Sequence, residues 1–300
     1  MKKILVIGSS NTDMIVKVPH IPAPGETVLG TDFFTVQGGK GANQAVAAAR
    51  AGGDVTFVAC VGNDEFGKKA KEAYENEGIN TRYVKTIDQA ATGVALINVA
   101  DSGENSISVA PGANSFLSPK DIASLENVIS QADVLLMQLE VPLETIEKAS
   151  ELANKHHVKI ILNPAPAQKL DQRLLEKITI LTPNENEAEL IVGAESGVSS
   201  AMQLTRDLHK LGISSVVLTL GEKGAYYSTS DNRKEIAGIK VKAADTTAAG
   251  DTFNGYLAVA LASGESMDDA IQIANKAAAI SVTRLGAQPS IPRMKEIVAI

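Results

Sequence analysis

The segment from Asp245 to Gly255 contains the residues of this chain that are best suited to chemistry. Its sequence, DTTAAGDTFNG, leads directly into the apolar run 256–261, which predicts a loop followed by a buried helix. Unpaired N–H groups at a helix N-terminus attract an anion, and Gly250 lets a ligand approach the backbone closely. Asp251 places a carboxylate beside that anion site. An anion site next to a base suits the transfer of a phosphoryl group to a hydroxyl.

Asp251 also has a simpler interpretation, because aspartate is a favoured residue at a helix N-cap. For an isolated aspartate before a helix, that interpretation would be preferred. The second carboxylate of Asp245, the Ala-Ala-Gly sequence that leads to Asp251 and the motifs described next favour a catalytic role instead.

A second candidate is the glycine-rich segment GGKGANQ at residues 38–44. It lacks the Gly-x4-Gly-Lys-Ser/Thr spacing of a P-loop, because Ala42 and Asn43 follow Gly41. Its glycines allow close backbone approach, and Lys40 and Asn43 offer polar contacts to a ligand. The alternative is a plain glycine turn before a helix, and this motif alone does not decide between the two.

Asn11 and Asp13 follow the first expected strand, in the sequence GSSNTD at residues 8–13. A turn here would let the two side chains converge, and a carboxylate with an amide suits sugar hydroxyls, which both donate and accept hydrogen bonds. The alternative is an Asx-turn. The segment lacks Gly-x-Gly-x-x-Gly, which argues against a dinucleotide site and against a nicotinamide-dependent oxidoreductase.

Three more candidates follow expected strands. Glu140 ends a buried strand, at the edge where parallel sheets bind ligands. Asn184 and Glu187 are spaced to approach magnesium and phosphates through waters, or to form a capping box at a helix start. The segment 219–224 ends in a glycine turn that either cradles phosphates with backbone N–H groups or closes a hairpin.

The elements that must position these residues alternate along the chain. Near-continuous apolar strands between amphipathic helices predict an α/β fold, with a central, mostly parallel sheet flanked by helices on both faces. We expect strands at 4–8, 55–61, 134–138, 159–162, 178–181 and 216–220, and helices at 42–51, 65–77, 119–130, 143–154, 185–192, 201–211, 252–263 and 267–284.

Two segments break this alternation, because residues 13–37 and 89–109 have the alternating pattern of half-exposed strands. We interpret them as two insertions that form a small β lid on a core domain of residues 1–12, 38–88 and 110–300. An apolar sheet face must be covered, so substrate, a partner subunit or both are expected to cover it.

Composition narrows the classes of partner. The 300 residues carry a net charge of −7 with both signs interspersed, which argues against nucleic acid as the main partner. Cys60 is the one cysteine and lies in an apolar run, which predicts a buried strand residue and fits a reducing cytoplasm. No apolar segment has the length of a membrane span, so we expect a cytoplasmic protein without a membrane partner.

Taken together, these motifs resemble the ribokinase family of carbohydrate kinases (PfkB-type), from residue 4 to about residue 292. The segments NPAPA at 163–167, TPNE at 182–185 and RLGAQPS at 284–290 add to the resemblance. It implies ATP-dependent phosphorylation of D-ribose at the 5-hydroxyl. Alternatives are a kinase for fructose, a ketosugar acid or adenosine, and a sugar-binding module without catalysis.

The resemblance also implies roles for individual residues. Asp251 would be the general base, and the N–H groups of Ala248, Ala249 and Gly250 would hold the transferring phosphoryl group. The lid would also form the contact of a homodimer. Asn275 stands where some relatives carry histidine near the adenine. The implied ligand sets are Asn11, Asp13, Gly39, Lys40, Asn43, Glu140 and Asp251 for the sugar; Asn184, Thr219, Gly221, Gly224, Gly250 and Asn275 for ATP; Glu187 for magnesium; and Asp245, Thr247, Ser281, Arg284, Gly286 and Ser290 for potassium.

Overall fold

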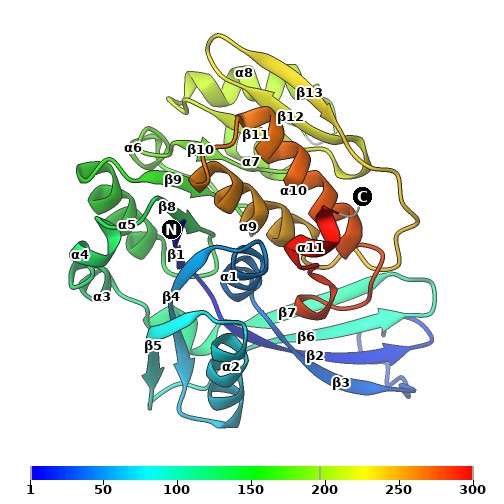
Figure 1. Ribbon diagram of the computed structural model, residues 1–300. Helices are drawn as coiled ribbons and strands as arrows, with labels where there is room; N and C mark the ends of the chain where they lie inside the picture. Colours follow the sequence, from blue (N-terminus) through cyan, green and yellow to red (C-terminus); the bar gives the residue numbers. More distant parts are fainter. Residues whose placement is uncertain (1, 196, 299–300) are drawn as a thin grey trace.

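The computed structural model describes residues 2–195 and 197–298, and these residues form two β-sheets with helices around the larger one (Figure 1). The larger sheet has the order β13-β12-β11-β10-β9-β8-β1-β4-β5. Its strands are β1 Lys3–Ile7, β4 Asp54–Gly62, β5 Asn80–Ile87, β8 Val134–Met137, β9 Lys159–Leu162, β10 Ile180–Leu181, β11 Val216–Thr219, β12 Gly224–Ser228 and β13 Arg233–Ala237.

The larger sheet is parallel from β5 to β11, which confirms the expected α/β class. At one edge, the pairings β11–β12 and β12–β13 are antiparallel. Successive residues of β1 point to opposite faces, so Ile4 and Val6 pack in one core layer while Leu5 and Ile7 pack in the other. Burial on both faces explains why the central strands are continuous apolar runs. Cys60 of β4 is fully buried, as expected.

Helices cover both faces of this sheet (Figure 1). One layer includes the helices that carry Lys40, Asn43 and Asp251, and the other layer, built from the middle of the chain, includes the helix that carries Glu187. The first layer contains α1 Lys40–Arg50, α2 Glu65–Asn76, α9 Ala249–Ala262, α10 Met267–Ser281 and α11 Met294–Ile297; the second contains α3 Pro119–Ala123, α4 Glu126–Ile129, α5 Leu143–Lys155, α6 Gln172–Leu175, α7 Glu185–Val192 and α8 Ala201–Lys210.

A separate four-stranded sheet has the order β3-β2-β6-β7 and lies at the lower right of Figure 1. Its strands are β2 Asn11–Val18, β3 Phe33–Gly38, β6 Gly93–Ala100 and β7 Asn105–Ala110. The pairing aligns Phe34, Ile15, Ile97 and Ile107 in one row across the four strands. Directly paired residues share a face, so this row makes one face of the small sheet apolar.

The structure differs from the elements expected from the sequence in several details. The helix expected at 119–130 is divided into α3 and α4, and at the break the hydroxyl of Ser124 donates to the carbonyl oxygen of Asp121 at 2.6 Å. Such side-chain bonds compete with the helical pattern. Strand β5 and the β12–β13 hairpin were not expected, because their sequences lack long apolar runs. No helix in the described part of the chain combines the length and apolarity needed to cross a bilayer.

Candidate active site

Asn11 and Asp13 lie in strand β2 and not in a turn, so the turn expected from the sequence is wrong. The expectation failed because residues two apart in a strand face the same side, which brings the two side chains together without a turn. The orientation of Asn11 is set by Asn114, whose Nδ2 donates to Asn11 Oδ1 at 2.7 Å. Asn114 also accepts from the N–H of Ser10 at 2.9 Å. No motif in the sequence pointed to Asn114.

The glycine-rich segment forms the first turn of α1, with Gly39 as the N-cap residue at φ 87°. The helix therefore begins earlier than the expected residue 42. A Cβ on Gly39 would lie 2.7 Å from the backbone nitrogen of Asn11, and a Cβ on Gly41 would lie 2.4 Å from that of Ser9. Both glycines are thus needed to bring the start of α1, with Lys40, against the start of β2.

Glu140 joins this assembly from the loop after β8. Its Oε2 accepts hydrogen bonds from Ser9 Oγ at 2.5 Å and from the backbone N–H of Lys40 at 3.0 Å. The second bond places a carboxylate at the N-terminus of α1, where the helix dipole favours negative charge. Ser9 is a further residue that the sequence did not single out.

The charged groups around this assembly perturb one another. Burial, with repulsion from Glu140 and Asp251, raises the pKa of Asp13 to about 7. Burial also opposes the charged form of Lys40, but the carboxylates of Asp251 and Glu140 outweigh it and raise the Lys40 pKa. Desolvation raises the pKa of Glu187. The site is therefore a desolvated cluster of carboxylates around one ammonium group.

Asp251 lies in the first turn of α9 and is 6% exposed. Two amides from α1 bind its carboxylate: Asn43 Nδ2 donates to Oδ2 and Gln44 Nε2 donates to Oδ1, each at 2.9 Å. Close packing of the two helices makes this possible, because a Cβ on Gly255 would lie 2.4 Å from the Cβ of Ala47. The tertiary structure thus joins the two strongest sequence motifs, which lie about 200 residues apart.

The backbone just before Asp251 has the geometry of an exposed helix start. Ala248 is the N-cap residue in a left-handed conformation, with φ 59°. The N–H of Ala249 donates to the carbonyl oxygen of Thr246 at 3.2 Å. Among the described residues, no hydrogen bond uses the N–H of Ala248 or Gly250. Two of the three N–H groups expected to hold an anion are thus free, and the third is engaged.

A cleft of about 500 Å³ opens on the other side of Gly250. Apolar side chains such as Phe253 and Val282 form part of its wall. The structure brings all six residues expected to face ATP into the lining of this one cleft: Asn184, Thr219, Gly221, Gly224, Gly250 and Asn275.

Local structure in the cleft follows the simpler alternatives left open by the sequence. Asn184 and Glu187 form a capping box at the start of α7: Glu187 N–H donates to Asn184 Oδ1 at 2.8 Å, and Asn184 N–H donates to Glu187 Oε2 at 2.9 Å. The glycine segment 221–224 closes the hairpin between β11 and β12. Asn275 donates to the carbonyl oxygens of Ile236 and Ala237, both at 3.3 Å.

Three of the residues expected to bind potassium are in direct contact. Asp245 Oδ1 accepts from the N–H and hydroxyl of Thr247 at 2.9 and 2.6 Å, and Oδ2 accepts from Gly286 N–H at 2.8 Å. The other three lie along the segment 281–290 that contains Gly286: Ser281 O accepts from Arg284 N–H at 3.0 Å, and Ser290 Oγ donates to Ala287 O at 2.7 Å. Within residues 2–195 and 197–298, no group of three or more His, Cys, Asp and Glu side chains is arranged to hold a metal ion.

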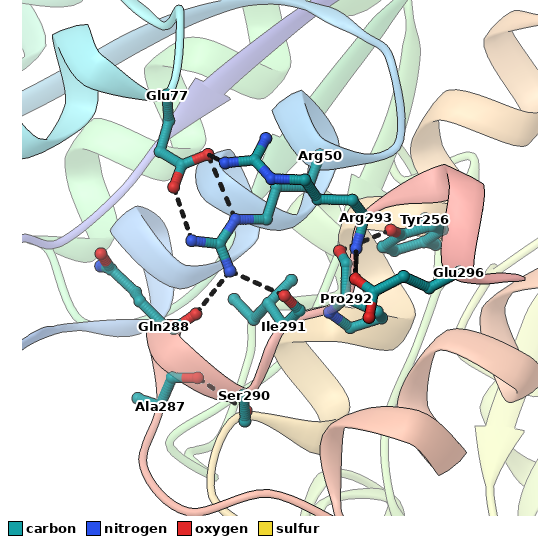
Figure 2. Close-up of polar contacts among 10 residues, drawn as sticks. All are labelled: Arg50, Glu77, Tyr256, Ala287, Gln288, Ser290, Ile291, Pro292, Arg293 and Glu296. Carbon is teal, nitrogen blue, oxygen red and sulfur yellow. Dashed lines mark hydrogen bonds and ion pairs between the residues drawn. The ribbon is translucent and has the colours of Figure 1, made fainter.

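Arg50, in the last turn of α1, anchors this C-terminal segment (Figure 2). Its Nη1 donates to the carbonyl oxygens of Gln288 and Ile291, both at 2.7 Å. Its Nε and Nη2 bind the carboxylate of Glu77 at 3.2 and 2.5 Å. Because a bidentate guanidinium–carboxylate pair fixes geometry, one helix holds Lys40 and Asn43 at its start and the Gly286 segment at its end.

Comparison with known proteins gives the same family at every level. Residues 1–294 match the protein family described as "pfkB family carbohydrate kinase". The chain is 49% identical over 296 residues to a ribokinase of Haemophilus influenzae, with 98% of this chain and 97% of that protein covered.

Solved structures agree in fold. The crystal structure of a ribokinase from Thermotoga maritima superposes with a TM-score of 0.92 at 39% identity and covers 100% of this chain and 99% of that one. An Arabidopsis thaliana ribokinase complexed with ribose and ATP gives a TM-score of 0.90 at 31% identity, with 99% and 98% covered. Since the family match and these relatives span almost the whole sequence, the chain belongs to the pfkB family of carbohydrate kinases.

Proposed function

We propose that this carbohydrate kinase uses ATP to phosphorylate D-ribose on its 5-hydroxyl. The observation that carries the proposal is the place of Asp251, between the polar assembly around Asp13 and Glu140 and the cleft lined by Gly250. A sugar on one side and a nucleotide on the other would meet at this carboxylate. The relatives named ribokinase, one of them complexed with ribose and ATP, support the choice of sugar and nucleotide.

The sugar would bind among Asn11, Asp13, Gly39, Lys40, Asn43, Glu140 and Asp251. Asn43 Oδ1 is buried and lacks a hydrogen-bond partner among the described residues. A buried acceptor without a partner is costly, and a sugar hydroxyl would satisfy it. Carboxylates and amides side by side suit a ligand whose hydroxyls donate and accept at once.

In the reaction, the Asp251 carboxylate would take the proton of the 5-hydroxyl while that oxygen attacks the γ-phosphorus of ATP. The bond from phosphorus to the bridging oxygen breaks, and ADP leaves with the electron pair. The free N–H groups of Ala248 and Gly250 would stabilise the charge on the transferring group. Ala249 would join them once its hydrogen bond to Thr246 opens. ATP itself would occupy the cleft lined by Asn184, Thr219, Gly221, Gly224, Gly250 and Asn275.

Magnesium fits beside Glu187 as an ion held mostly through waters, because Glu187 is a largely buried carboxylate with only Oε2 engaged by the capping box. Magnesium would offset the negative charge of the phosphates. Potassium would bind at the two loops that Asp245 joins through its bonds to Thr247 and Gly286, because carboxylate and carbonyl oxygens are the ligands that hard cations prefer. Its expected set is Asp245, Thr247, Ser281, Arg284, Gly286 and Ser290, and its effect would be to hold the loop before Ala248 in shape.

The small sheet would serve as a lid, built from residues 13–37 and 89–109, and as the contact of a homodimer. Its apolar face supports this, because Phe34 and Ile107, at the two ends of the apolar row, are 39% and 54% exposed. We expect sedimentation to give a dimer for the wild type and a monomer for Ile107→Lys. Ser108→Lys, which places the same charge on the opposite face of β7, is the matched control and should remain dimeric.

The decisive experiment is ADP release from purified protein with magnesium-ATP and a panel of D-ribose, fructose and adenosine, in potassium chloride and in tetramethylammonium chloride. We expect turnover with D-ribose that potassium stimulates. Turnover with another acceptor and none with ribose would overturn the assignment of D-ribose as the substrate. Equal rates in the two salts would overturn the cation site, and no turnover with any acceptor would overturn the proposal as a whole.

A further inference from the structure

Gln44 contacts the carboxylate of Asp251 but has no part in the function proposed above. It is fully buried in α1, and its Nε2 donates to Asp251 Oδ1 at 2.9 Å and to Asn163 Oδ1 at 3.1 Å. Its Oε1 accepts from Gln138 Nε2 at 2.6 Å. Both hydrogens of the amide nitrogen and the amide oxygen are therefore engaged, and the side chain is held from three directions.

The direction of these hydrogen bonds is forced by chemistry. An ionised carboxylate can only accept, so the amide of Gln44 must turn its nitrogen towards Asp251. Its oxygen then faces Gln138, which must donate. The side-chain oxygen of Gln138, Oε1, is then left buried without a partner among the described residues. An unsatisfied buried oxygen costs free energy. The fold tolerates this cost in the one orientation that lets Gln44 donate to Asp251.

A second branch leads from Gln44 back to the start of α9. Asn163 Nδ2 donates to the carbonyl oxygen of Thr182 at 3.1 Å, and Thr182 Oγ1 donates to Asn254 Oδ1 at 2.6 Å. Asn254 Nδ2 in turn donates to the carbonyl oxygen of Gly250 at 2.8 Å. The chain of amides thus begins at the Asp251 side chain and ends on the peptide just before Asp251. It fixes the carboxylate and its backbone relative to each other.

We propose that Gln44 is a positioning residue for phosphoryl transfer: it sets the orientation of the Asp251 carboxylate towards the sugar hydroxyl, with Gln138 acting through it. The proposal rests on the proposed function, in which Asp251 is the base. Asn43 holds Oδ2 on the sugar side, and Gln44 holds Oδ1 on the interior side. Without the interior contact, Asn43 alone holds the carboxylate, which can then turn away from its orientation towards the sugar.

The first test is Gln44→Leu, which keeps the size of the side chain and removes its donors. We expect kcat with ribose to fall roughly 10- to 100-fold, because a small misplacement of a catalytic group costs up to about that much. The KM for ATP should stay as in the wild type, because Gln44 does not line the nucleotide cleft. An unchanged kcat would overturn the proposal.

A double-mutant cycle separates positioning from loss of stability. Gln138→Leu alone should lower kcat by less than Gln44→Leu does, and adding it to Gln44→Leu should cause no further loss, because Gln138 acts through Gln44. Independent, multiplying losses would overturn the relay. Should Gln44→Leu fail to fold, the kcat of Gln138→Leu decides, and an unchanged value would overturn the proposal. Thr145→Val is the matched control, because it deletes a buried hydrogen bond, to Leu117 O, in the other layer of the fold.

Gln44→Glu adds a readout that a merely structural role would not move. Two carboxylates in contact share a proton, so the acid limb of the pH–rate profile should shift to higher pH. The other charged groups facing Asp251, namely Asp13, Lys40 and Glu187, are the same in both proteins. An unshifted pH–rate profile would overturn the proposal that Gln44 acts on the base. If Asp251→Asn retains full turnover, the base assignment fails instead, and a wild type without kinase activity would overturn both.

Discussion

The residues on the two sides of Asp251 differ in chemical type. On the side of Asp13 and Glu140, buried ionisable side chains crowd together, and burial with like charges raises the pKa of Asp13 to about 7. On the side of Gly250, the cleft is lined by glycines, apolar side chains and neutral polar side chains such as Asn184 and Asn275, with the carboxylates of Glu185 and Glu222. We expect the first side to recognise its ligand mainly through charged groups, and the second mainly through its shape and through neutral polar groups. Single substitutions should therefore act strongly on the first side and weakly on the second.

The largest effect is expected at the boundary itself. Asp251→Asn should lower kcat roughly 10²- to 10⁴-fold, which is the usual worth of a general base, while calorimetry should still detect binding of sugar and ATP. The amide cannot accept the proton, and one of the two donors, Asn43 or Gln44, loses its acceptor. Asp231→Asn, in the exposed β12–β13 turn, is the control and should be fully active. Near-normal turnover of Asp251→Asn would show that Asp251 is not the general base.

The next effect tests the charged side. Asp13→Asn should raise the KM for ribose roughly 10- to 100-fold, because a hydrogen bond to a charged group contributes about 1.5–3 kcal/mol. The KM for ATP should not change, since Asp13 does not line the cleft. Equal increases in both KM values would show that the two sides are not separate.

The raised pKa of Asp13 also predicts how the stability of the fold depends on pH. Its folded pKa, about 7, lies above the ordinary value of 3.8, so the folded state binds the proton more tightly than the unfolded state. The associated stability is fully present below about pH 4 and is lost as the pH rises through 7. Thermal unfolding should therefore find Asp13→Asn more stable than the wild type at pH 8, with the difference narrowing towards pH 4. A constant difference across this range would contradict the shifted pKa.

Two glycines of the same helix sharpen the contrast between the cleft and the protein interior. A Cβ on Gly250 meets no atom within 4 Å, so Gly250→Ala should fold normally but place a methyl group in the cleft, raising the KM for ATP roughly tenfold, or about 1.4 kcal/mol. Gly255→Ala should instead lower the free energy of unfolding by about 1–3 kcal/mol through overpacking against Ala47. Steady-state kinetics and thermal melts distinguish the two, and a normal KM for Gly250→Ala would place the nucleotide elsewhere.

The smallest effect is expected at Asn275. Its amide nitrogen already binds the carbonyl oxygens of Ile236 and Ala237, so Asn275→Ala removes at most one neutral contact to the nucleotide. Such a contact is worth about 0.5–1.5 kcal/mol, and the KM for ATP should rise by less than roughly tenfold. A greater loss than that caused by Asp13→Asn on the sugar side would reverse the comparison between the two sides.

Local patterns in the sequence were enough to predict the α/β class and most central elements, because burial on both faces of a parallel sheet forces apolar strands and the alternation with helices is local in the chain. The sequence also marked both ends of the site, at residues 38–44 and 245–255. It failed where the pattern was weak: strand β5, the β12–β13 hairpin and the divided helix at α3 and α4 have no long apolar period.

Which side chains come into contact depends on how the chain folds. The sequence assigned no role to Gln44, Asn114, Gln138 or Asn163. In the fold these residues orient Asn11 and Asp251, because contacts between distant segments depend on how helices and strands pack and not on spacing. The pKa of Asp13 is equally invisible in the sequence, since burial and neighbouring charge raise it only in the folded chain. Local physics therefore fixed the elements and the chemical types of this site, and long-range packing fixed its electrostatics and the alignment of its base.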